Sequence, residues 1–471
     1  MTTTTTVLNP ATAEPIDEVV DADRAEVDNT LERASRAQRE WAALPLVARR
    51  DGLRAIADVI HAHLDEIARV ETLNVGKPIS SSRAEIAGVA EAFNYYAGLV
   101  DKIMGNTIPV DGGVDLTFRE PLGVVAVIAP WNFPLAIAAW NVAPALAAGN
   151  AVVVKPAEQT PLSTVLFAQL VAKLDLPANL VQVLTGQGHT VGRLLTDHPL
   201  VAKISFTGST ETGIEVMQTA AKTMKRVTLE LGGKSANVVF EDCDLDRAIA
   251  AAPMGVFDNT GQDCCARSRI LVERSIFHEF VAGFIDATHR LRIGDPFDPD
   301  TQLGPLISAE HRKRVASFVD EPDLDIMTIG AVPDGPGFWM APHVVINPGR
   351  ERRIVKEEVF GPVVAILPFD DEADAVALAN DTIYGLSGSI WTSDVGRALR
   401  VARGIQSGAL SVNSNSSVRL QTPFGGFKQS GMGRELGLAA IDGYTELKNV
   451  FIDTAGPTAT SYSHGLDALS V

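Results

Sequence analysis

Short continuous apolar runs alternate with helically spaced stretches along the first half of the chain. Residues 23–75 carry apolar side chains at helical spacing, with Ile56, Val59, Ile60, Leu64 and Ile67 on one face. The later runs are continuous and β-branched, as in strands buried on both faces of a parallel sheet. Strands are predicted over 123–129, 151–154, 180–184 and 201–206, with helices over 163–174 and 191–197. This βαβ rhythm predicts an open α/β, nucleotide-binding layout with a parallel sheet.

The rhythm restarts after Gly233. Strands are predicted over 236–240 and 270–272 with a helix over 246–259 between them, so a second α/β domain begins near Lys234. The Pro-, Gly- and Asp-rich segment 295–337 predicts an excursion of loops and a helix. An isolated strand over 445–453 is expected to pair with a Gly-interrupted strand pair at 107–119, and a mobile tail is expected after Ala455.

The segment 121–154 is uncharged and long enough to raise the alternative of a membrane span. It is interrupted by Pro130, Pro134 and Pro144, which favours strand, turn, helix, turn and strand instead. The threonine-rich N-terminus has neither a basic nor an apolar signal-peptide region, so no secretory leader is expected.

Composition narrows the function classes. A chain of 471 residues has room for about three domains, and its net charge of −18 argues against a nucleic-acid or membrane partner. The cysteines are Cys243, Cys264 and Cys265, which give no disulfide framework and no zinc spacing. A reducing, cytoplasmic location and no metal are therefore predicted.

Two segments carry candidate chemistry. Cys264 follows a Gly-Gln turn and is a candidate nucleophile, because a thiolate can attack a carbonyl carbon. Glu230 precedes Leu-Gly-Gly-Lys-Ser and is a candidate general base for activating water. The alternatives are a buried structural cysteine and a surface glutamate at a strand end.

Together these segments resemble the NAD(P)-dependent aldehyde dehydrogenase superfamily. Further family-like segments follow in order at 130–134, 154–161, 206–213, 356–362 and 423–431, and the resemblance covers about Asn9 to Asp453. It implies a hydrolytic, NAD-preferring enzyme that oxidises an aldehyde to the acid. It also implies a Rossmann-like cofactor domain, a second α/β catalytic domain, a small β oligomerisation element, and a homodimer or homotetramer.

The resemblance assigns the catalytic roles. The thiol of Cys264 forms a thiohemiacetal and then a thioester, and Glu230 activates the water that hydrolyses the thioester. The side-chain amide of Asn132, with the backbone N–H of Cys264, is implied to form an oxyanion hole. Asn132 between two prolines is otherwise plain turn chemistry. An intact Glu230 favours release by water over release by coenzyme A.

The resemblance also assigns the cofactor residues. Lys155 and Glu158 follow a strand and are implied to bind the adenine ribose; a carboxylate there would repel the 2′-phosphate of NADP, so NAD is expected. A solvated loop is the alternative. Glu358 is implied to hold the nicotinamide ribose, although Glu357 is its neighbour. The full cofactor set is Trp131, Lys155, Glu158, Gly188, Gly208, Ser209, Gly213, Leu231, Glu358 and Phe360.

The chain departs from its relatives in the substrate pocket. Asp263 replaces a residue that is more often neutral, and a serine-rich loop at 415–419 replaces positions that are often apolar. Asp263 favours a cationic substrate such as an aminoaldehyde; alternatively it caps its own turn or pairs with Arg267 or Arg269. The predicted pocket set is Phe133, Ile137, Trp140, Asp263, Cys265, Ser417 and Phe424.

Three other functions stay open at this point. In the first, the enzyme oxidises an aliphatic or aromatic aldehyde. In the second, coenzyme A accepts the acyl group and the product is an acyl-coenzyme A. In the third, the fold serves a non-enzymatic role. The predicted domains are 1–101 with 122–232 for NAD, 233–429 for catalysis, 102–121 with 430–454 for oligomerisation, and a tail at 455–471.

Overall fold

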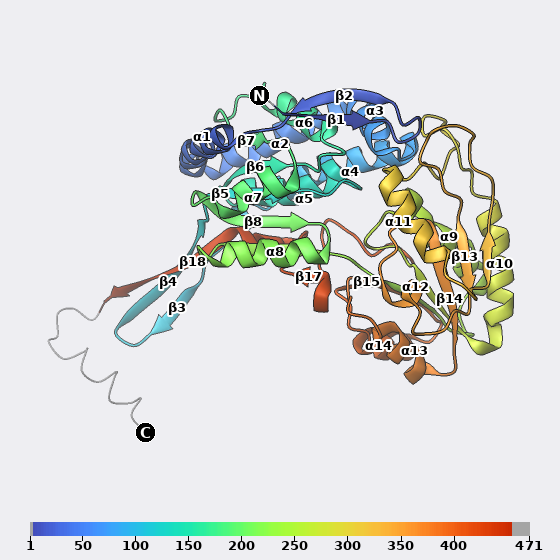
Figure 1. Cartoon of the computed structure of the whole chain (residues 1–471). Coiled ribbons are helices and arrows are strands. Elements are labelled where there is room, and N and C mark those ends of the chain that lie inside the picture. The colour runs from blue at the N-terminus through green and yellow to red at the C-terminus, as the bar shows by residue number, and fades with distance from the viewer. Residues whose placement is uncertain (1–2, 455–471) are drawn as a thin grey trace.

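A computed structural model describes residues 3–454 of the chain, so the tail predicted at 455–471 lies outside the described residues. Over this range the chain forms two lobes, each built on its own sheet, and a smaller sheet projects from the first lobe (Figure 1).

The first lobe contains a six-stranded sheet within the described range. Its order is β17-β9-β8-β5-β6-β7, and every strand except β17 is parallel to its neighbours. The strands predicted at 123–129, 151–154, 180–184 and 201–206 are all confirmed. The bounds are β5 (Val124–Ile128), β6 (Ala151–Lys155), β7 (Val181–Val183), β8 (Val201–Thr207), β9 (Arg226–Glu230) and β17 (Gly431–Met432).

The amphipathic stretch at 23–75 forms three helices of the first lobe. Pro45 separates the first two and His63 the next two. Ile56, Ile60 and Ile67 are buried as predicted, whereas Val59 and Leu64 are half-buried. The lobe's helices are α1 (Arg24–Ala43), α2 (Leu46–Ala62), α3 (Leu64–Val75), α4 (Ile79–Ala97), α5 (Pro134–Ala147), α6 (Leu162–Val171), α7 (Arg193–Asp197) and α8 (Thr210–Ala221).

The uncharged segment 121–154 folds as β5, α5 and β6. Pro134 begins α5, where its missing N–H costs no hydrogen bond, and Asn150 closes the turn into β6 through bonds to Ala145 and Tyr444 carbonyls. Across residues 3–454, the helices are too short or too polar to cross a bilayer.

The second lobe contains a seven-stranded sheet in the part of the chain that is described. Its order is β12-β13-β14-β11-β10-β15-β16, and only β12 is antiparallel. Neighbouring residues of strand β10 point into separate hydrophobic cores on the two faces of the sheet. Val238 belongs to the core formed with helices α11 to α14, and Val239 belongs to the core formed with helices α9 and α10, whose bounds are given below. The strands are β10 (Ala236–Val239), β11 (Arg269–Glu273), β12 (Ile326–Thr328), β13 (His343–Ile346), β14 (Val363–Phe369), β15 (Ser387–Trp391) and β16 (Ala409–Val412).

Helices cover both faces of this second sheet. The predicted helix at 246–259 and strands at 236–240 and 270–272 are confirmed, and the excursion at 295–337 contains one helix and one short strand. The helices are α9 (Leu245–Phe257), α10 (Phe277–His289), α11 (Ala309–Val319), α12 (Arg353–Lys356), α13 (Glu372–Asn380) and α14 (Val395–Gly404). The short helical turns are η1 (Val100–Lys102), η2 (Gly188–Gly192), η3 (Asp258–Gly261), η4 (Arg274–Ile276), η5 (Lys428–Ser430) and η6 (Leu438–Tyr444).

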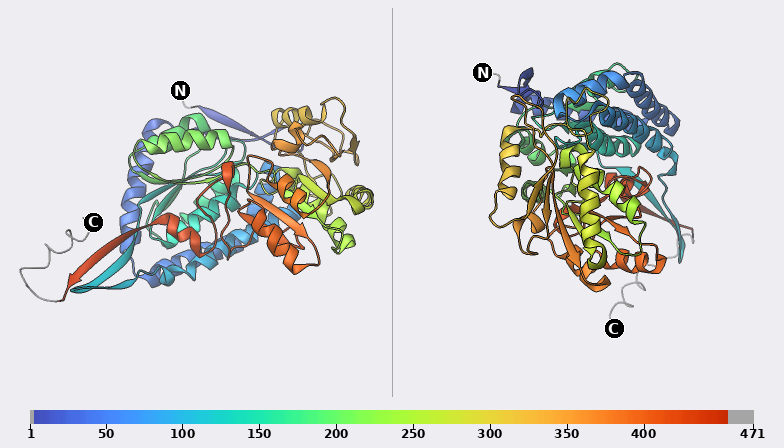
Figure 2. Two further views of the ribbon diagram at one scale, coloured as in Figure 1. Left: turned by 90° about the horizontal axis from the view of Figure 1, so that it is seen from below. Right: turned by 90° about the vertical axis from the view of Figure 1, so that its right-hand side faces the viewer.

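A three-stranded antiparallel sheet projects beyond the first lobe (Figure 2). The strand predicted at 445–453 is β18 (Thr445–Asp453), and it pairs with β4 (Gly113–Pro121), which in turn pairs with β3 (Thr107–Val110). The predicted pairing is confirmed. Leu447, Phe451 and Phe118 on this sheet are exposed.

No strand was predicted in the N-terminal threonine run. It forms β1 (Thr4–Leu8), which pairs with β2 (Pro15–Val20) in an antiparallel hairpin. Threonine is β-branched and favours strands, and Asn9 begins the turn with a side-chain bond to the Ala11 N–H. The run is therefore structural rather than a feature of low complexity.

Candidate active site

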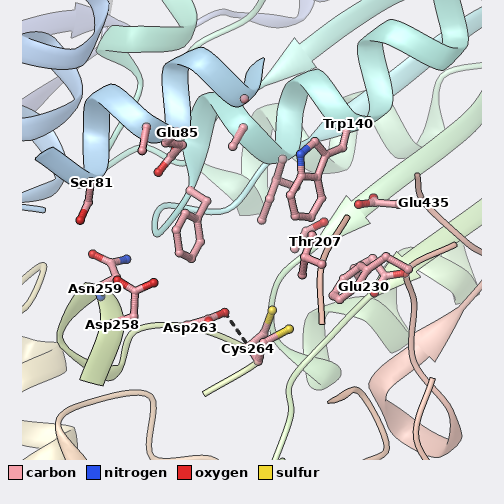
Figure 3. Close-up of a pocket in the computed structure, with 18 of the residues that line it drawn as sticks. Ser81, Glu85, Trp140, Thr207, Glu230, Asp258, Asn259, Asp263, Cys264 and Glu435 are labelled. Atoms are coloured by element: carbon pink, nitrogen blue, oxygen red, sulfur yellow. Dashed lines mark hydrogen bonds between the residues drawn. The ribbon is translucent and has the colours of Figure 1, made fainter. Parts of the chain in front are cut away.

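A cavity of about 440 Å³ lies where the two lobes meet (Figure 3). The first lobe contributes residues from α4, α5, β8 and β9, and the second contributes the segment around Cys264 and the loop before Phe424. Cys264 and Glu230 both line this cavity, with six of the seven residues predicted for the pocket. These six are Phe133, Ile137, Trp140, Asp263, Cys265 and Phe424.

Cys264 lies on a strained turn that precedes β11. Asn259, Thr260 and Gly261 have φ values of 48°, 58° and 72°, and a left-handed conformation is costly for a β-branched threonine. A Cβ at Gly261 would overlap the Gly361 carbonyl. Thr260 is held by its hydroxyl, which donates to the Gly304 carbonyl at 2.9 Å. The surrounding protein therefore imposes this conformation.

Two fully buried polar side chains fix the turn on either side of Cys264. The Gln262 amide donates to the Asn259 carbonyl at 3.1 Å and accepts from the Ile307 N–H at 2.9 Å. The Arg267 guanidinium donates to the Cys265 carbonyl and, at 3.0 Å, to the Asn415 carbonyl. Because these partners of Gln262 and Arg267 are backbone groups, the protein itself holds the Cys264 thiol in position without a bound substrate.

The surroundings of Cys264 favour its thiol form over its thiolate form. Its hydrogen bond with the Cys265 side chain raises its pKa well above the ordinary value, and burial and nearby carboxyl groups act in the same direction. Attack by the thiolate therefore needs a proton acceptor in the cavity.

Glu230 ends β9 at the cavity wall and is only 3% exposed. Both of its carboxyl oxygens are without a hydrogen-bond partner among the described residues. Burial raises the pKa of Glu230 well above its ordinary range, and Glu435 raises it further. A buried carboxyl that readily takes up a proton has the properties of a general base.

Asn132 lies in the loop between β5 and α5 and is 3% exposed. Its Nδ2 donates to the Gln262 carbonyl at 3.0 Å, and its own carbonyl accepts from the Asn259 amide at 3.1 Å. The loop is thus bonded directly to the turn that carries Cys264. An amide has two N–H groups, so this bond leaves a second donor for an oxyanion.

Most of the predicted cofactor residues lie on the first lobe, whereas Glu358 and Phe360 lie between α12 and β14 on the second lobe. The Lys155 ammonium, 2% exposed, is 3.1 Å from the Glu158 carboxylate, and burial lowers the pKa of Lys155. Glu158 and Gly188 line a second cavity of about 450 Å³ between η2, α7 and α8. Its apolar walls include Ile128, Phe206 and Val216.

The turn from β8 into α8 is organised by side chains and by a neighbouring strand. The Ser209 hydroxyl caps α8 by accepting from the Thr212 N–H at 3.2 Å, and the Gly208 N–H donates to the Glu230 carbonyl at 3.0 Å. A Cβ at Gly213 would meet the Leu231 side chain. The amides of a helix's first turn lack partners within the helix, so this end is suited to a phosphate.

Glu358 turns inward and Glu357 turns outward. The Glu358 carboxylate accepts from the Gly233 N–H at 2.8 Å, and burial raises its pKa to about 7. Glu357 is exposed and pairs with Arg353. Phe360 has φ 60°, and its ring lies 5.2 Å from that of Trp131. The geometry therefore makes Glu358, and not Glu357, the inward-facing carboxylate, bonded to the Gly233 N–H.

Asp263 caps its own turn while it lines the cavity. Its Oδ1 accepts from the Cys265 N–H at 2.9 Å, and burial raises its pKa. In the described part of the chain neither arginine forms an ion pair with it: Arg267 bonds to carbonyls and hydroxyls, and Arg269 donates to the carbonyls of Lys234, Leu378 and Ala379. The sequence offered two alternatives for Asp263, which were capping its own turn and facing the substrate. The Asp263 side chain caps the turn and also lines the cavity.

Ser417 is engaged with protein groups. Its hydroxyl lies 2.7 Å from the Ser387 hydroxyl and accepts from Arg267 at 3.1 Å. Its neighbours Val418, Arg419 and Leu420 line the cavity instead.

Sequence reasoning missed several cavity residues that come from α4 and from the end of α9. They carry no family-like motif, and only the helical spacing of Ser81, Ala84, Glu85 and Gly88 could have placed them on one face. The missed charged residues are Lys77, Glu85, Asp258 and Glu435.

Comparison with known proteins gives consistent matches. The model of the aldehyde dehydrogenase family matches residues 1–450. The betaine aldehyde dehydrogenase of Bacillus subtilis (strain 168) is 40% identical over 467 residues, covering 97% of this chain and 95% of that protein.

Solved structures match equally well. The betaine aldehyde dehydrogenase (betB) of Staphylococcus aureus in complex with NAD+ has a TM-score of 0.93 at 38% identity, over 98% of this chain and 93% of that one. PnpE in complex with nicotinamide adenine dinucleotide has a TM-score of 0.94 at 41% identity, over 97% and 96%. The predicted α/β fold class is confirmed.

Proposed function

Because this chain belongs to the aldehyde dehydrogenase family, we propose that Cys264, Glu230 and Asn132 carry out the oxidation of an aldehyde to its carboxylic acid. The match to the family model confirms the resemblance predicted from the sequence. The chain is an NAD-dependent aldehyde dehydrogenase. One observation supports this assignment of residues. The Cys264 thiol, held in position by the surrounding protein, lines the same cavity as the buried Glu230 carboxyl group, which has no hydrogen-bond partner among the described residues.

The proposed chemistry balances over two half-reactions. The Cys264 thiol releases its proton to solvent water as the sulfur bonds to the aldehyde carbon, giving a thiohemiacetal whose oxyanion is held by Asn132 and the Cys264 N–H. Loss of hydride from that carbon leaves a thioester on Cys264, and NAD held by the residues named below would supply the hydride acceptor. Glu230 then takes a proton from water, the hydroxide adds to the thioester carbon, and the acid leaves as the C–S bond breaks.

The residues present fit NAD. The cavity between η2, α7 and α8 has apolar walls and a size suited to an adenine ring. Lys155 and Glu158 at its edge would hold the ribose, the N-terminus of α8 the pyrophosphate, and Glu358 the second ribose. Trp131, Leu231, Ser209 and Phe360 complete the proposed site.

The carboxylate of Glu158 is proposed to select NAD. Replacing it with glutamine removes the charge that would repel a 2′-phosphate, while Lys155 nearby remains to bind it. We expect the KM for NADP in Glu158→Gln to fall at least about tenfold, with NAD kinetics changing less. Steady-state kinetics with both cofactors would test this, and an unchanged NADP KM would exclude Glu158 as the selector.

The proposed function is tested by reduced-cofactor formation. The purified, reduced protein is supplied with NAD or NADP and with aliphatic, aromatic or amino-substituted aldehydes, with and without coenzyme A. Turnover with NAD and no coenzyme A supports hydrolytic oxidation. Turnover only with coenzyme A would reject Glu230 as the base for water.

The proposed substrate is an aminoaldehyde. Asp263 lines the cavity beside Cys264 and is free of any ion pair with the described arginines, so its charge is open to a cationic substrate. The similar betaine aldehyde dehydrogenases have names that denote a cationic aldehyde.

Removing Asp263 should affect charged substrates most. In Asp263→Ala the KM for aminoaldehydes is expected to rise about tenfold or more, and the KM for aliphatic aldehydes to change far less. Asp263→Asn is the matched control, because it removes the charge and keeps an oxygen to cap the Cys265 N–H. If both variants affect charged and neutral aldehydes equally, the electrostatic role is wrong.

The projecting sheet is proposed as the assembly element of a homodimer or homotetramer in the cytoplasm. Leu447, Phe451 and Phe118 are exposed on β18 and β4, and exposed apolar sheet surfaces commonly mark interfaces. The proposed division is a cofactor domain at 1–101 and 122–232, a catalytic domain at 233–429, and the assembly element at 102–121 and 430–454.

A further inference from the structure

The active-site cavity has a second polar end, apart from the thiol. Ser81 and Glu85 on α4 lie across from Asp258 and Asn259 at the beginning of the strained turn (Figure 3). Apolar side chains, including Phe133 and Ile137, form the wall of the same cavity. An extended molecule in the cavity would therefore meet the thiol at one end and carboxyl groups at the other.

Glu85 has one carboxyl oxygen that no described residue satisfies. Its side chain is 9% exposed, and its Oε2 accepts from the buried Lys77 ammonium. Its Oε1 is buried and has no hydrogen-bond partner among residues 3–454. The carboxyl group projects from α4 toward the cavity (Figure 3). A buried carboxyl oxygen without a donor is costly, so a ligand donor at this position would be stabilising.

Carboxyl groups outnumber basic side chains at this end. The Lys77 ammonium interacts with both Glu85 and the fully buried Glu71, and it lies 3.6 Å from the Glu71 carboxylate. It also lies 4.2 Å from the centre of the Phe133 ring. Asp258 and Asp263 face the same space from the opposite side. The other cation, Arg419, is exposed and donates to the Ser416 carbonyl. The end of the cavity therefore favours a cation over an anion.

The open space beside Glu85 has a sequence cause. Gly88 lies one helical turn further along α4 and also lines the cavity, and a Cβ built there meets no atom within 4 Å. The approach to Glu85 is therefore open at this position, and a long side chain in place of Gly88 would narrow it.

Building on the proposed aldehyde oxidation, we propose that Glu85 binds the terminal ammonium group of an ω-aminoaldehyde whose carbonyl carbon reaches Cys264. The ammonium has three donors, and Ser81 and Asp258 supply further acceptors beside the free oxygen of Glu85. The methylene chain packs along Phe133 and Ile137. Asp263, close to the nucleophile, adds to the same negative potential.

The ionisation of Glu85 is linked to the binding of a cationic ligand: burial favours the neutral acid in the empty cavity, and a bound cation would shift it toward the carboxylate. Burial raises the pKa of Glu85 to about 8, against the lowering effect of Lys77 and with a raising effect of Glu71. An ammonium group nearby favours the carboxylate form, so the ligand and Glu85 stabilise each other's charged states.

The test compares ω-aminohexanal with hexanal, which share a chain length and differ in terminal charge. In Glu85→Gln the KM for ω-aminohexanal should rise about 10- to 100-fold, the range expected for a lost hydrogen bond between charged groups. The KM for hexanal should stay within about twofold, because uniform binding of the chain is unaffected. Glu85→Asp, which keeps the charge, should retain a preference for the amine.

Glu91→Gln is the matched control. Glu91 lies on the same helix with a side chain 58% exposed, so this variant should alter neither substrate. A rise in KM that is equal for both aldehydes, or an unchanged preference for the amine, would overturn the role of Glu85. Either result would leave the proposed aldehyde oxidation intact. Failure of the native protein to oxidise either aldehyde with NAD would overturn the proposed function itself.

Discussion

Replacing Cys264 with alanine will abolish aldehyde oxidation, with kcat falling on the order of 10⁵-fold or more, as when a covalent nucleophile is removed from other enzymes. The reason is that both half-reactions pass through a bond to this sulfur. Without the thiohemiacetal there is no carbon from which hydride leaves readily. Reduced-cofactor formation, measured in the steady state at saturating aldehyde, gives the result directly.

Cys265→Ala is the matched control for this loss. Cys265 is adjacent and buried, and its side chain hydrogen-bonds to Cys264. Because that bond is the largest cause of the raised pKa of Cys264, its removal should speed alkylation of Cys264 and leave turnover largely intact. Loss of activity in Cys265→Ala with retention in Cys264→Ala would reverse the assignment of the nucleophile.

Replacing Glu230 with glutamine will separate the two half-reactions. We expect kcat to fall by about 10²- to 10⁴-fold, the range for a lost general base, while the first turnover persists. Rapid mixing should then show a burst of reduced cofactor close to the enzyme concentration, followed by a slow phase as the thioester hydrolyses. The absence of a burst would mean that Glu230 acts before the thioester forms.

The pH dependence of the slow phase follows from the same carboxyl group. Burial, and after it Glu435, raise the pKa of Glu230, and only the deprotonated carboxylate takes a proton from water. Hydrolysis in the native enzyme should therefore increase as pH rises through that raised pKa. In Glu230→Gln this rise should disappear, and a variant that keeps it would assign the ionisation to another group.

The sequence predicted the parallel strands because their signal is local. The runs that became β5 and β6 are apolar on both faces over most of their length, which few other structures allow. The hairpin of β1 and β2 was missed because five consecutive threonines give no alternation of apolar and polar residues, although their β-branching favours a strand.

The site was predictable only where its residues lie in compact motifs. Cys264, Glu230 and Asn132 stand beside glycine or proline turns, and the family resemblance fixed their proposed roles. Glu85 and Lys77 lie on or beside a helix far away in sequence, where a charged residue usually faces solvent. Their burial depends on how α4 packs against α5, and no local pattern determines that contact.

The partner of Asp263 could not be chosen from sequence spacing. Arg267 and Arg269 were both within reach by residue number, yet each guanidinium is used by carbonyl groups on other elements. Only the tertiary structure shows that the acceptor oxygen of Asp263 serves the Cys265 N–H two residues along.

Two sheets of this protein are completed by the last part of the chain to be synthesised. β9 gains an antiparallel neighbour only when Gly431 and Met432 arrive, and β4 pairs along its whole length with Thr445–Asp453. While the nascent chain is still on the ribosome, both strands have open edges that can pair with other chains. Cellular yield should therefore depend on how quickly the C-terminal strand reaches β4, and a truncation that removes it should fail by aggregation rather than by loss of the catalytic groups.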